Sequence, residues 1–427
     1  MAMEDKSLEI MPNDWVPANS MIKVIGVGGG GCNAVTYMYN QKIQGCSFIV
    51  CNTDSQALQK STVPVKIQMG KGLGAGTDPT KGRNAALESQ DDIAAIAMDG
   101  TTQMLFITAG MGGGTGTGAA PVIAKMAKDK GILTVAVVTL PFKNEGNESL
   151  SKAVDGIHEL EKNVDSLLII NNEKLYKFFG DQLIQDAFPK ADEVLATAVR
   201  GITEIISKPG YINVDFEDVK TMMKNSGMAL LGCGTGTGKN RLEDAVKEAL
   251  ESPLLNDFDL KTAKNVLINI TAGKNENGLL MNELNKINDL INEYTGGKAN
   301  KFKRGLIWDE DPEIGDKIHI TAIATGFALS KLSDITDVNV GKLIMIDKDF
   351  TYNRLGTNKG DAIDIPVNED YFRKVGFNTT ENVRSFHFGD NEKPALIVEP
   401  GQNIAELENI PAIRRTAKPS SPDPEND

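Results

Sequence analysis

The run from Gly112 to Gly118 constrains this chain most, because it holds five glycines and two threonines in seven residues. Glycine lets backbone amides approach and surround an anion. An apolar, strand-like run at 104–109 precedes it, and a helix is expected at 119–130, with Pro121 in its first turn. Such a helix would direct its N-terminal amides at an anion. The pattern favours a phosphate-binding loop over a flexible linker, since a linker rarely separates a strand from a helix start.

The residues after this run exclude the best-known phosphate loop. A Walker A loop ends in Lys followed by Ser or Thr, whereas Ala119 and Ala120 stand here. A second glycine-threonine segment, 232–240, does contain a Gly-Lys pair. However, Cys233 replaces its leading glycine and Asn240 replaces the magnesium-binding hydroxyl. We therefore expect 232–240 to be a surface loop without a phosphate role.

A third glycine cluster follows the first apolar run of the chain. Gly26, Gly28 and Gly31 fit the dinucleotide-binding fingerprint, and Asp54 lies where an acid would bind the ribose hydroxyls. A nicotinamide-dependent oxidoreductase is therefore a rival interpretation of this segment. It does not explain the richer run described first or a further glycine loop at 72–79. Three loops that converge on phosphate indicate a bound triphosphate.

These motifs resemble those of the FtsZ family, the bacterial branch of the tubulin/FtsZ GTPases. The run from Gly112 to Gly118 is similar to the family's signature loop, and segments 52–54, 72–76 and 213–218 stand in the family's order. The resemblance extends from about residue 21 to about residue 327 and returns in a short tail. It implies an α/β fold with an N-terminal Rossmann-like parallel-sheet GTPase domain, a long central core helix, and a smaller C-terminal α/β domain. A mostly disordered linker and a short C-terminal binding peptide would follow.

Apolar runs alternate with helix-like segments in the first part of the chain, which independently predicts a parallel sheet covered by helices on both faces. The expected strands are 22–27, 48–52, 104–109, 133–139 and 167–171. Ligands of such sheets bind beyond the carboxyl ends of the strands, where the glycine loops fall. Next, apolar residues at helical spacing predict a long core helix at 191–208, which Pro209 and Gly210 would end. The smaller unit is expected to contain a helix after 218, a helix at 241–251 and strands near 265–271 and 319–324.

The chain is accordingly divided into six segments. They are a disordered start (1–20), a GTP-binding domain (21–190), the core helix (191–212), a GTPase-activating domain (213–329), a linker with a strand-like run at 342–346 (330–404), and a partner-binding peptide with its tail (405–427). An apolar and basic island in the tail matches the family peptide that docks on membrane-tethering division proteins. It consists of Ile410, Pro411, Ile413, Arg414 and Arg415. Composition alone leaves a binding role and an inert tail equally open.

Composition limits the compartment and the partners. The chain of 427 residues is 41% hydrophobic, but it has no stretch long enough to span a membrane and no signal-peptide pattern at its start. Cys32, Cys46, Cys51 and Cys233 have neither metal-site nor disulfide-scaffold spacing, so they are expected to be reduced and buried. A formal charge of −13 argues against nucleic acid as a partner and against direct adsorption to an anionic membrane. We expect a cytoplasmic protein, which the resemblance places at the division site.

Hydrolysis of a triphosphate requires charge neutralisation and an oriented water. Asp215 and Asp218 are spaced i and i+3, so a helix start would put both carboxylates on one face, beside Asn213, where they could polarise water. Taken alone, these residues are more simply a helix N-cap and a first-turn acid. The resemblance instead assigns the three residues as catalytic, on a loop that completes the nucleotide site of the next subunit. A head-to-tail contact of this kind is heterologous and builds a filament.

Base selection is assigned mainly by the resemblance. Phe188 can stack on a purine, and Asp192 can accept the two N–H groups that guanine presents. Both match the family's guanine contacts, although a core residue and a helix-start acid are simpler interpretations. Asn172 matches a base or ribose contact, although Asn171 replaces the usual proline before it, and Glu145 matches an acid near the ribose.

Ser149 is the most serious departure from the family pattern, which has a nucleotide-contacting arginine there. We expect weaker nucleotide binding or slower turnover unless Lys143 compensates. The expected ligands are GTP or GDP, with Mg²⁺ held mainly by the phosphates. The resemblance implies the nucleotide-binding positions Gly28, Gly29, Gly30, Gly31, Asn33, Asn52, Asp54, Gly74, Ala75, Gly76, Gly112, Gly113, Gly114, Thr115, Gly116, Thr117, Gly118, Thr139, Pro141, Glu145, Asn172, Phe188 and Asp192.

Together these features favour a polymerising GTPase that hydrolyses GTP between head-to-tail subunits of a division ring. A tubulin-like filament protein with a role outside division, in DNA segregation or cell shape, stays open as the first alternative. A nicotinamide-dependent oxidoreductase is the second.

Overall fold

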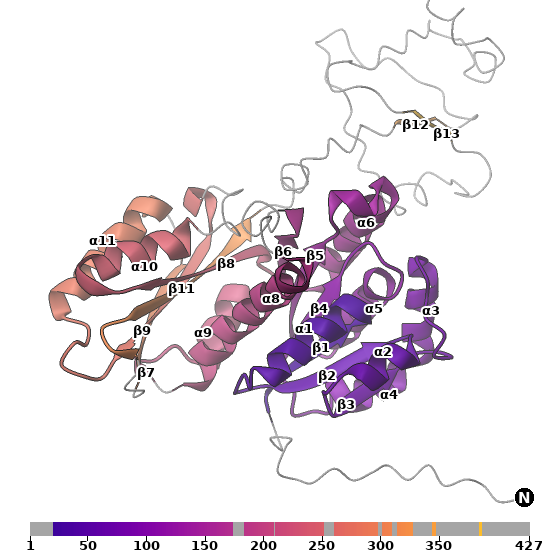
Figure 1. Ribbon diagram of the computed structural model, residues 1–427, viewed down its shortest axis with the longest axis horizontal. Coiled ribbons are helices and arrows are strands. Elements are labelled where there is room, and N and C mark those ends of the chain that lie inside the picture. Colours follow the sequence, from indigo (N-terminus) through magenta and orange to yellow (C-terminus); the bar gives the residue numbers. More distant parts are fainter. Residues whose placement is uncertain are drawn as a thin grey trace, which may run out of the picture. The chain divides into compact units, whose positions relative to one another are not determined.

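The computed structural model describes residues 20–173, 183–208, 210–251, 260–297, 301–309 and 314–327, together with two short strands at 344–346 and 384–386. The chain forms two compact units, Met1–Ile335 and Thr336–Asp427, and each is described by itself. The first unit contains every element from β1 to β11. Figure 1 shows its helices packed against an extended, twisted sheet.

The N-terminal half of this sheet is parallel throughout. Its order is β3-β2-β1-β4-β5-β6, formed by β1 (Ile22–Val27), β2 (Ser47–Asn52), β3 (Val65–Gln68), β4 (Met104–Gly110), β5 (Leu133–Leu140) and β6 (Ser166–Asn171). Helices cover both faces, so the central strands are continuous apolar runs in the sequence. The expected α/β fold class is confirmed, and only the short, half-exposed β3 was not expected.

The helices of this half are α1 (Gly28–Asn40), α2 (Ser55–Lys60), α3 (Pro79–Glu88), α4 (Gln90–Ala97), α5 (Thr115–Asp129) and α6 (Asn147–Asn163), with a 3₁₀ turn, η1, at Lys143–Glu145. The prediction for α5 was wrong at its start. The helix begins at Thr115, within the glycine run, so Pro121 lies inside the helix instead of in its first turn. The low helix propensity of glycine argued against a helix start in this run. Glycine is tolerated there because the N–H groups of a helix's first turn have no intrahelical partners in any case.

The central helix α8 (Ile184–Ser207) begins seven residues earlier than position 191 and runs through Pro189. Leu195, Val199 and Ile202 on α8 belong to one buried cluster with residues of β1, β4 and β8. The helix therefore connects the two halves of the unit through a shared core. It ends at Ser207, just before the expected stop.

The second half continues the same sheet. It contains β7 (Gly210–Ile212), α9 (Phe216–Met223), β8 (Gly227–Gly236), η2 (Gly238–Asn240), α10 (Arg241–Leu250), η3 (Leu260–Thr262), β9 (Asn265–Gly273), α11 (Met281–Thr295), β10 (Lys301–Asp309) and β11 (Ile318–Phe327). β8 pairs with β6, with Ser166 opposite Gly227, and the order runs on as β8-β11-β9-β10-β7. The two expected α/β domains thus share one eleven-stranded sheet.

The expectation that 232–240 is a surface loop was wrong. Residues up to Gly236 belong to β8, and the exposed residues of the segment are Thr235 and the turn at 237–240. A Cβ atom at Gly234 would collide with the backbone of Ala245, and one at Gly236 with that of Arg241. These glycines let α10 lie directly on β8, which is a packing role that strand glycines often have.

The cysteines agree with their expected role. Cys32, Cys46 and Cys51 are buried, Cys233 is half-buried, and all four are free. Burial raises the thiol pKa of Cys32 and of Cys46 to about 12, so these thiols stay protonated at neutral pH.

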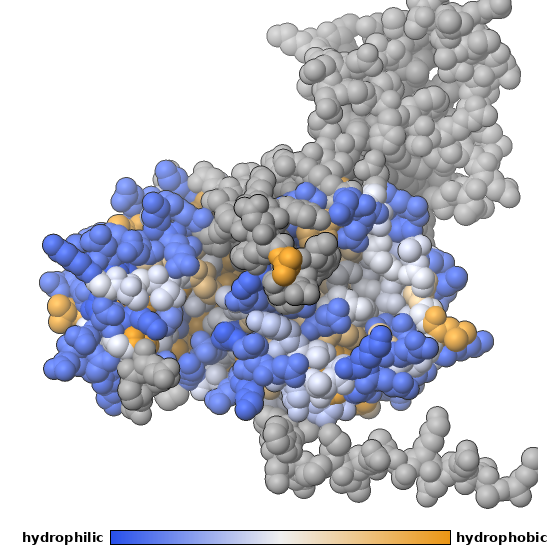
Figure 2. Space-filling view, viewed as in Figure 1, coloured by the Kyte–Doolittle hydropathy of each residue, from blue (hydrophilic) through white to orange (hydrophobic). Residues whose placement is uncertain are grey.

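In the second unit, β12 (Ile344–Ile346) pairs antiparallel with β13 (Arg384–Phe386), so the strand-like run expected at 342–346 does contain a strand. The remainder of the expected linker, the start of the chain and the tail peptide with Ile410 to Arg415 lie outside the described residues. None of the described helices combines the length and apolarity needed to cross a bilayer. Figure 2 shows a largely hydrophilic surface on the visible face of the described part.

Candidate nucleotide-binding site

Two helix N-termini meet at the carboxyl ends of the neighbouring strands β1 and β4. Helix α1 begins at Gly28 and α5 at Thr115, and neither has a side-chain cap or an acidic residue in its first turn. A Cβ atom at Gly28 would lie 2.8 Å from the amide nitrogen of Gly116, so the two N-termini are in contact. Each N-terminus carries unpaired N–H groups and a positive partial charge. Side by side, they form a site for an anion.

The other helices show that this pairing is unusual within the molecule. Asp54 caps α2 by accepting from the amide of Gln56 at 2.8 Å, and Asp78 caps α3 by accepting from Thr80 at 2.9 Å. The other helices whose first turns are described in full, α4, α6, α9, α10 and α11, each have an acid in that turn. Only α1 and α5, of those described in full, leave their N-terminal charge to an external anion.

Nine glycines at and beside these N-termini fall into two groups, according to what an added Cβ atom would meet. In the first group it would collide with backbone, so these glycines permit the close packing of helices and loops: Gly28, Gly31, Gly112, Gly114, Gly116 and Gly118. In the second group no atom lies within 4 Å: Gly29, Gly76 and Gly113. The second group borders open space in which phosphate oxygens could reach backbone amides.

The β2–α2 turn and the 70–76 loop form the next wall. The amide of Gly74 donates to the carbonyl of Thr53 at 2.8 Å, and Leu73 forms a β-bridge with Asp54. The hydroxyl of Thr53 lies 2.7 Å from that of Thr115, at the start of α5. The structure thus brings together three glycine-containing segments far apart in the sequence. We call this site, formed by 26–31, 52–54, 70–78 and 110–118, the cradle.

The β5–α6 connection lies against the run that begins at Gly112. Met111 donates its amide to the carbonyl of Thr139 at 2.9 Å. Gly112 has a φ of +99°, and a Cβ atom there would lie 3.1 Å from Pro141 and 2.9 Å from the carbonyl of Ser149. The positive φ and the close approach both require glycine at 112. Thr139, Pro141 and Ser149 are therefore placed beside the cradle.

Several expected contact residues have local roles in the fold. Glu145 accepts the amide of Phe142 at 2.9 Å and closes η1. Asn52 accepts the amide of Asp54 at 3.2 Å, and the carboxylate of Asp54 caps α2. Asn33 is exposed on α1. Their proximity to the site does not by itself identify a ligand contact.

Two of the polar groups expected to contact the base are affected by burial. The side-chain oxygen Oδ1 of Asn172, just after β6, is buried and has no hydrogen-bond partner among the described residues. Asp192 on α8 is half-buried, and this burial raises the pKa of its carboxyl to about 6. A buried acceptor without a partner costs about 1–3 kcal/mol, so an N–H or O–H donor on a ligand would be favourable there. The side chain of Phe188 lies outside the described part of the chain.

The three expected catalytic residues lie together around the start of α9. Asp215 is the N-cap of this helix and accepts the amide of Asp218 at 2.8 Å, while Asn213 accepts that of Gly210 at 2.8 Å. The carboxylate of Asp218 pairs with Lys303 on β10, with 2.6 Å between Oδ1 and Nζ. This hydrogen bond and the charge of Asp218 raise the pKa of Lys303. Lys303 was missed from the sequence, because nothing local to it indicates contact with α9.

This carboxylate-bearing segment joins the sheet at the end opposite to the cradle. The chain following α9 contacts Asp165, directly before β6: Ser226 donates to its carbonyl at 2.8 Å and Asn225 to its carboxylate at 3.2 Å. Asp165 also accepts the amide of Thr134, near the start of β5, at 3.0 Å. These are the amino ends of β5 and β6, whereas the cradle lies at the carboxyl ends. The eight residues of β5 span about 26 Å between the two ends.

Comparisons with known proteins give matches over most of the chain. Residues 21–180 match the family model described as Tubulin/FtsZ family, GTPase domain, and residues 227–328 match FtsZ family, C-terminal domain. The Cell division protein FtsZ of Porphyromonas gingivalis is 42% identical over 413 residues, which cover 96% of this chain and 85% of that protein. The Pseudomonas putida protein of the same name is 42% identical over 409 residues, 95% of this chain and 91% of that one.

Solved structures give the same result. The empty FtsZ dimer of M. jannaschii is 39% identical with a TM-score of 0.65, covering 73% of this chain and 88% of that one. The GTPgS-bound protofilament of CetZ2 from Haloferax volcanii has a TM-score of 0.62 at 19% identity, over 74% of this chain and 96% of that one, and supports the fold alone. The N-terminal half is thus a GTPase domain of the tubulin type. The chain belongs to the FtsZ family.

The family and fold class expected from the sequence are therefore confirmed. The rival interpretation as a nicotinamide-dependent oxidoreductase is not favoured. The acid expected to bind ribose in that case, Asp54, caps α2 instead.

Proposed function

We propose that this protein is a cell-division GTPase that binds GTP in the cradle and assembles head to tail into filaments. The observation that carries the proposal is the contact between the uncapped N-termini of α1 and α5, bordered by the open glycines Gly29, Gly76 and Gly113. The backbone amides there are suited to the phosphates. Asn172 and Asp192 would then accept hydrogen bonds from the sugar or base, and Asp192 favours guanine.

Mg²⁺ is proposed to bind mainly through the nucleotide phosphates. The hydroxyls of Thr53 and Thr115, 2.7 Å apart at the start of α5, are oxygen donors of the kind that this ion accepts directly or through water. When bound, the ion would neutralise charge that develops on the phosphates. The protein's own contribution is to fix the phosphates against two helix N-termini.

We propose that Asp215 and Asp218 act on the nucleotide of a neighbouring subunit. Within one molecule they join the sheet at the end opposite to the cradle. Asp218 has one oxygen paired with Lys303, which fixes the carboxylate, and its second oxygen can accept a proton from an attacking water. Water then forms the new bond to the γ-phosphorus while the bond to the β–γ bridging oxygen breaks.

Exposed apolar residues at both ends support a contact between copies. Leu73 in the 70–76 loop is 90% exposed, and Tyr211, two residues before Asn213, is 76% exposed. Covering these two side chains by a neighbouring copy would remove apolar surface from water, which favours association. Because the two faces differ, the contact is heterologous and repeats into a filament. Loss of the γ-phosphate would weaken it.

The cellular setting follows from the relatives named Cell division protein FtsZ. We propose that the filaments form in the cytoplasm at the division site. We also propose that Ile410, Pro411, Ile413, Arg414 and Arg415 bind membrane-tethering division proteins.

Phosphate release from GTP and from ATP, with Mg²⁺ and over a range of protein concentrations, tests the proposed function. Light scattering is followed in the same samples. We expect release from GTP only, above a threshold concentration at which scattering also rises. Release proportional to protein concentration without scattering would mean a site complete within one molecule. No release with either nucleotide would contradict the assignment as an active GTPase.

A further inference from the structure

One face of α6 lies along the cradle. The carbonyl of Ser149 is beside Gly112, and a Cβ atom at Gly156 would contact the side chains of Thr117 and Met111. Positions 149, 152 and 156 are spaced i, i+3 and i+7, so they share one face of the helix. Lys152 is therefore on the face that packs against the cradle.

The ammonium group of Lys152 reaches the edge of the cradle. Its Nζ donates to the carbonyl of Thr77 at 2.9 Å. Both neighbours of Thr77 touch the start of α5, since a Cβ atom at Gly114 would lie 2.5 Å from the carbonyl of Gly76 and 3.0 Å from the amide of Asp78. The side chain of Lys152 is 24% exposed, so it is held largely within the protein surface.

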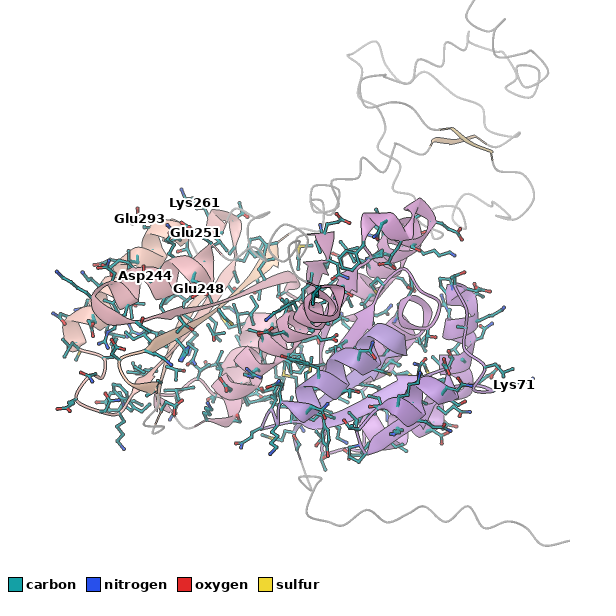
Figure 3. All side chains as sticks on the ribbon, viewed as in Figure 1. Lys71, Asp244, Glu248, Glu251, Lys261 and Glu293 are labelled. Atoms are coloured by element: carbon teal, nitrogen blue, oxygen red, sulfur yellow. The ribbon has the colours of Figure 1, made fainter. Side chains whose placement is uncertain are left out.

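The cradle has few other sources of full positive charge. The glycine runs 26–31 and 110–118 contain no Lys or Arg, and position 149 is serine. Lys71 in the 70–76 loop is exposed, and Figure 3 shows it at the outer edge of the molecule. Helix N-termini supply only partial charges, each equivalent to roughly half an elementary charge. Of the four segments that form the cradle, only 70–78 contains a lysine, so the loops give a bound triphosphate little full positive charge beside the proposed Mg²⁺.

We propose that Lys152 binds the phosphates of the guanine nucleotide, and so supplies the cation that Ser149 does not. This inference rests on the nucleotide site proposed above. An ammonium has three N–H donors. Among the described residues two are used, by Thr77 and by Glu148, whose Oε1 is 2.6 Å from Nζ. The carbonyl of Thr77 holds the ammonium at the edge of the cradle, the exposed carboxylate of Glu148 competes for it, and the third N–H donates to a phosphate oxygen.

The test compares Lys152→Met and Lys152→Arg with the unchanged full-length protein. Binding of GTP, GDP and guanosine is measured with Mg²⁺ by competition against a fluorescent guanine nucleotide. Loss of a charge-assisted hydrogen bond should weaken GTP binding about tenfold to a hundredfold in Lys152→Met. Guanosine binding should not change, because guanosine has no phosphate. Lys152→Arg should retain most of the GTP affinity.

Glu148→Gln is the matched control, since it removes the ion pair and keeps the lysine. It should bind GTP at least as tightly as the unchanged protein, because Lys152 loses a competing carboxylate. Two results would overturn the proposal: unchanged GTP affinity in Lys152→Met, or equal losses for GTP and guanosine, which would assign Lys152 a structural role. If the unchanged protein itself bound no GTP, the nucleotide site would be at fault instead.

Discussion

Each glycine of the cradle has a role set by the space around its Cα atom. At Gly118 an added Cβ atom would collide with the carbonyl of Pro79, at the start of α3. At Gly113 the same atom would enter open space, and the backbone there does not have a positive φ. The first glycine is required for packing, and the second leaves room for a ligand.

Alanine at these two positions should therefore have opposite effects. Gly118→Ala should lower the free energy of unfolding by about 1–3 kcal/mol, because α3 and α5 must separate. Gly113→Ala should fold normally but bind GTP more weakly, because its methyl group enters the space for the phosphates. Urea unfolding measures the stability of both variants, and nucleotide titration measures their affinity for GTP. Normal GTP affinity in Gly113→Ala would show that the anion does not occupy this space.

The half-buried carboxyl of Asp192 should make GTP binding depend on pH. Burial raises its pKa to about 6. Because only the ionised carboxylate accepts both guanine N–H groups, protonation weakens binding, and guanine in turn lowers the pKa. We expect the affinity for GTP to fall by up to about tenfold per pH unit below pH 6.

Asp192→Asn is the control. Its side chain does not titrate, so any pH dependence that remains in this variant comes from the phosphates of GTP. Its affinity should be lower at pH 7 and should show only the pH dependence of the nucleotide. Titrations between pH 5 and 8 compare the two proteins. Identical pH profiles would remove Asp192 from the base-binding site.

At the scale of elements, buried apolar runs allowed the bounds of β1, β2, β4, β5 and β6 to be predicted to within one residue. Two strands whose formation depends on tertiary packing, β8 and β10, were not predicted. β8 contains glycines that accommodate α10, and the first half of β10 reads Lys-Phe-Lys-Arg. α11 was missed because its exposed face is rich in Asn and Glu. In these elements tertiary contacts outweigh local propensity.

The candidate site was predicted to the extent that it is local in sequence. The glycine loops are contiguous and carry their own signal. Lys152 and Lys303 have no such signal, because each acts through a contact with a distant segment: Thr77 for one and Asp218 for the other. Spacing along the chain cannot reveal contacts of this kind.

Arg241, the first residue of α10, should be a main source of stability in the second half of the sheet. It donates to the carboxylate of Glu283 at 2.7 and 3.1 Å, and to the carbonyls of Asn277, Gly278 and Asp316. Because Arg241 is buried, Arg241→Met should cost about 2–4 kcal/mol of unfolding free energy in urea titrations. A loss below about 0.5 kcal/mol, typical of surface pairs, would contradict this role.

The same ion pair should contribute a pH dependence. Burial opposes ionisation of Glu283, but the hydrogen bonds from Arg241 and from the amide of Leu280, together with the charges of Arg241 and Lys286, outweigh it, so the pKa of Glu283 is lowered. Its stabilisation is therefore present above the unfolded-state pKa, near 4, and is lost as the pH falls through the folded-state value. Arg241→Met should reduce this acid sensitivity.

At the scale of the whole molecule, one continuous sheet and the core around α8 hold the two functional ends apart. The cradle lies at the carboxyl ends of β1 and β4, and the carboxylate segment joins at the amino ends of β5 and β6. We propose that neither end completes a hydrolytic site alone. Filament growth and GTP hydrolysis would then use the same contact between neighbouring subunits.

Mixing two inactive variants tests this claim most directly. Asp218→Ala keeps the cradle but lacks the carboxylate, while Gly113→Asp keeps Asp218 and places a negative charge in the phosphate space. Each alone should release no phosphate from GTP. In an equal mixture about a quarter of randomly formed contacts join an intact cradle to an intact Asp218, so GTP hydrolysis should return. Co-sedimentation confirms that both variants enter the filaments. A mixture that co-sediments yet stays as inactive as its components would contradict an active site shared between subunits.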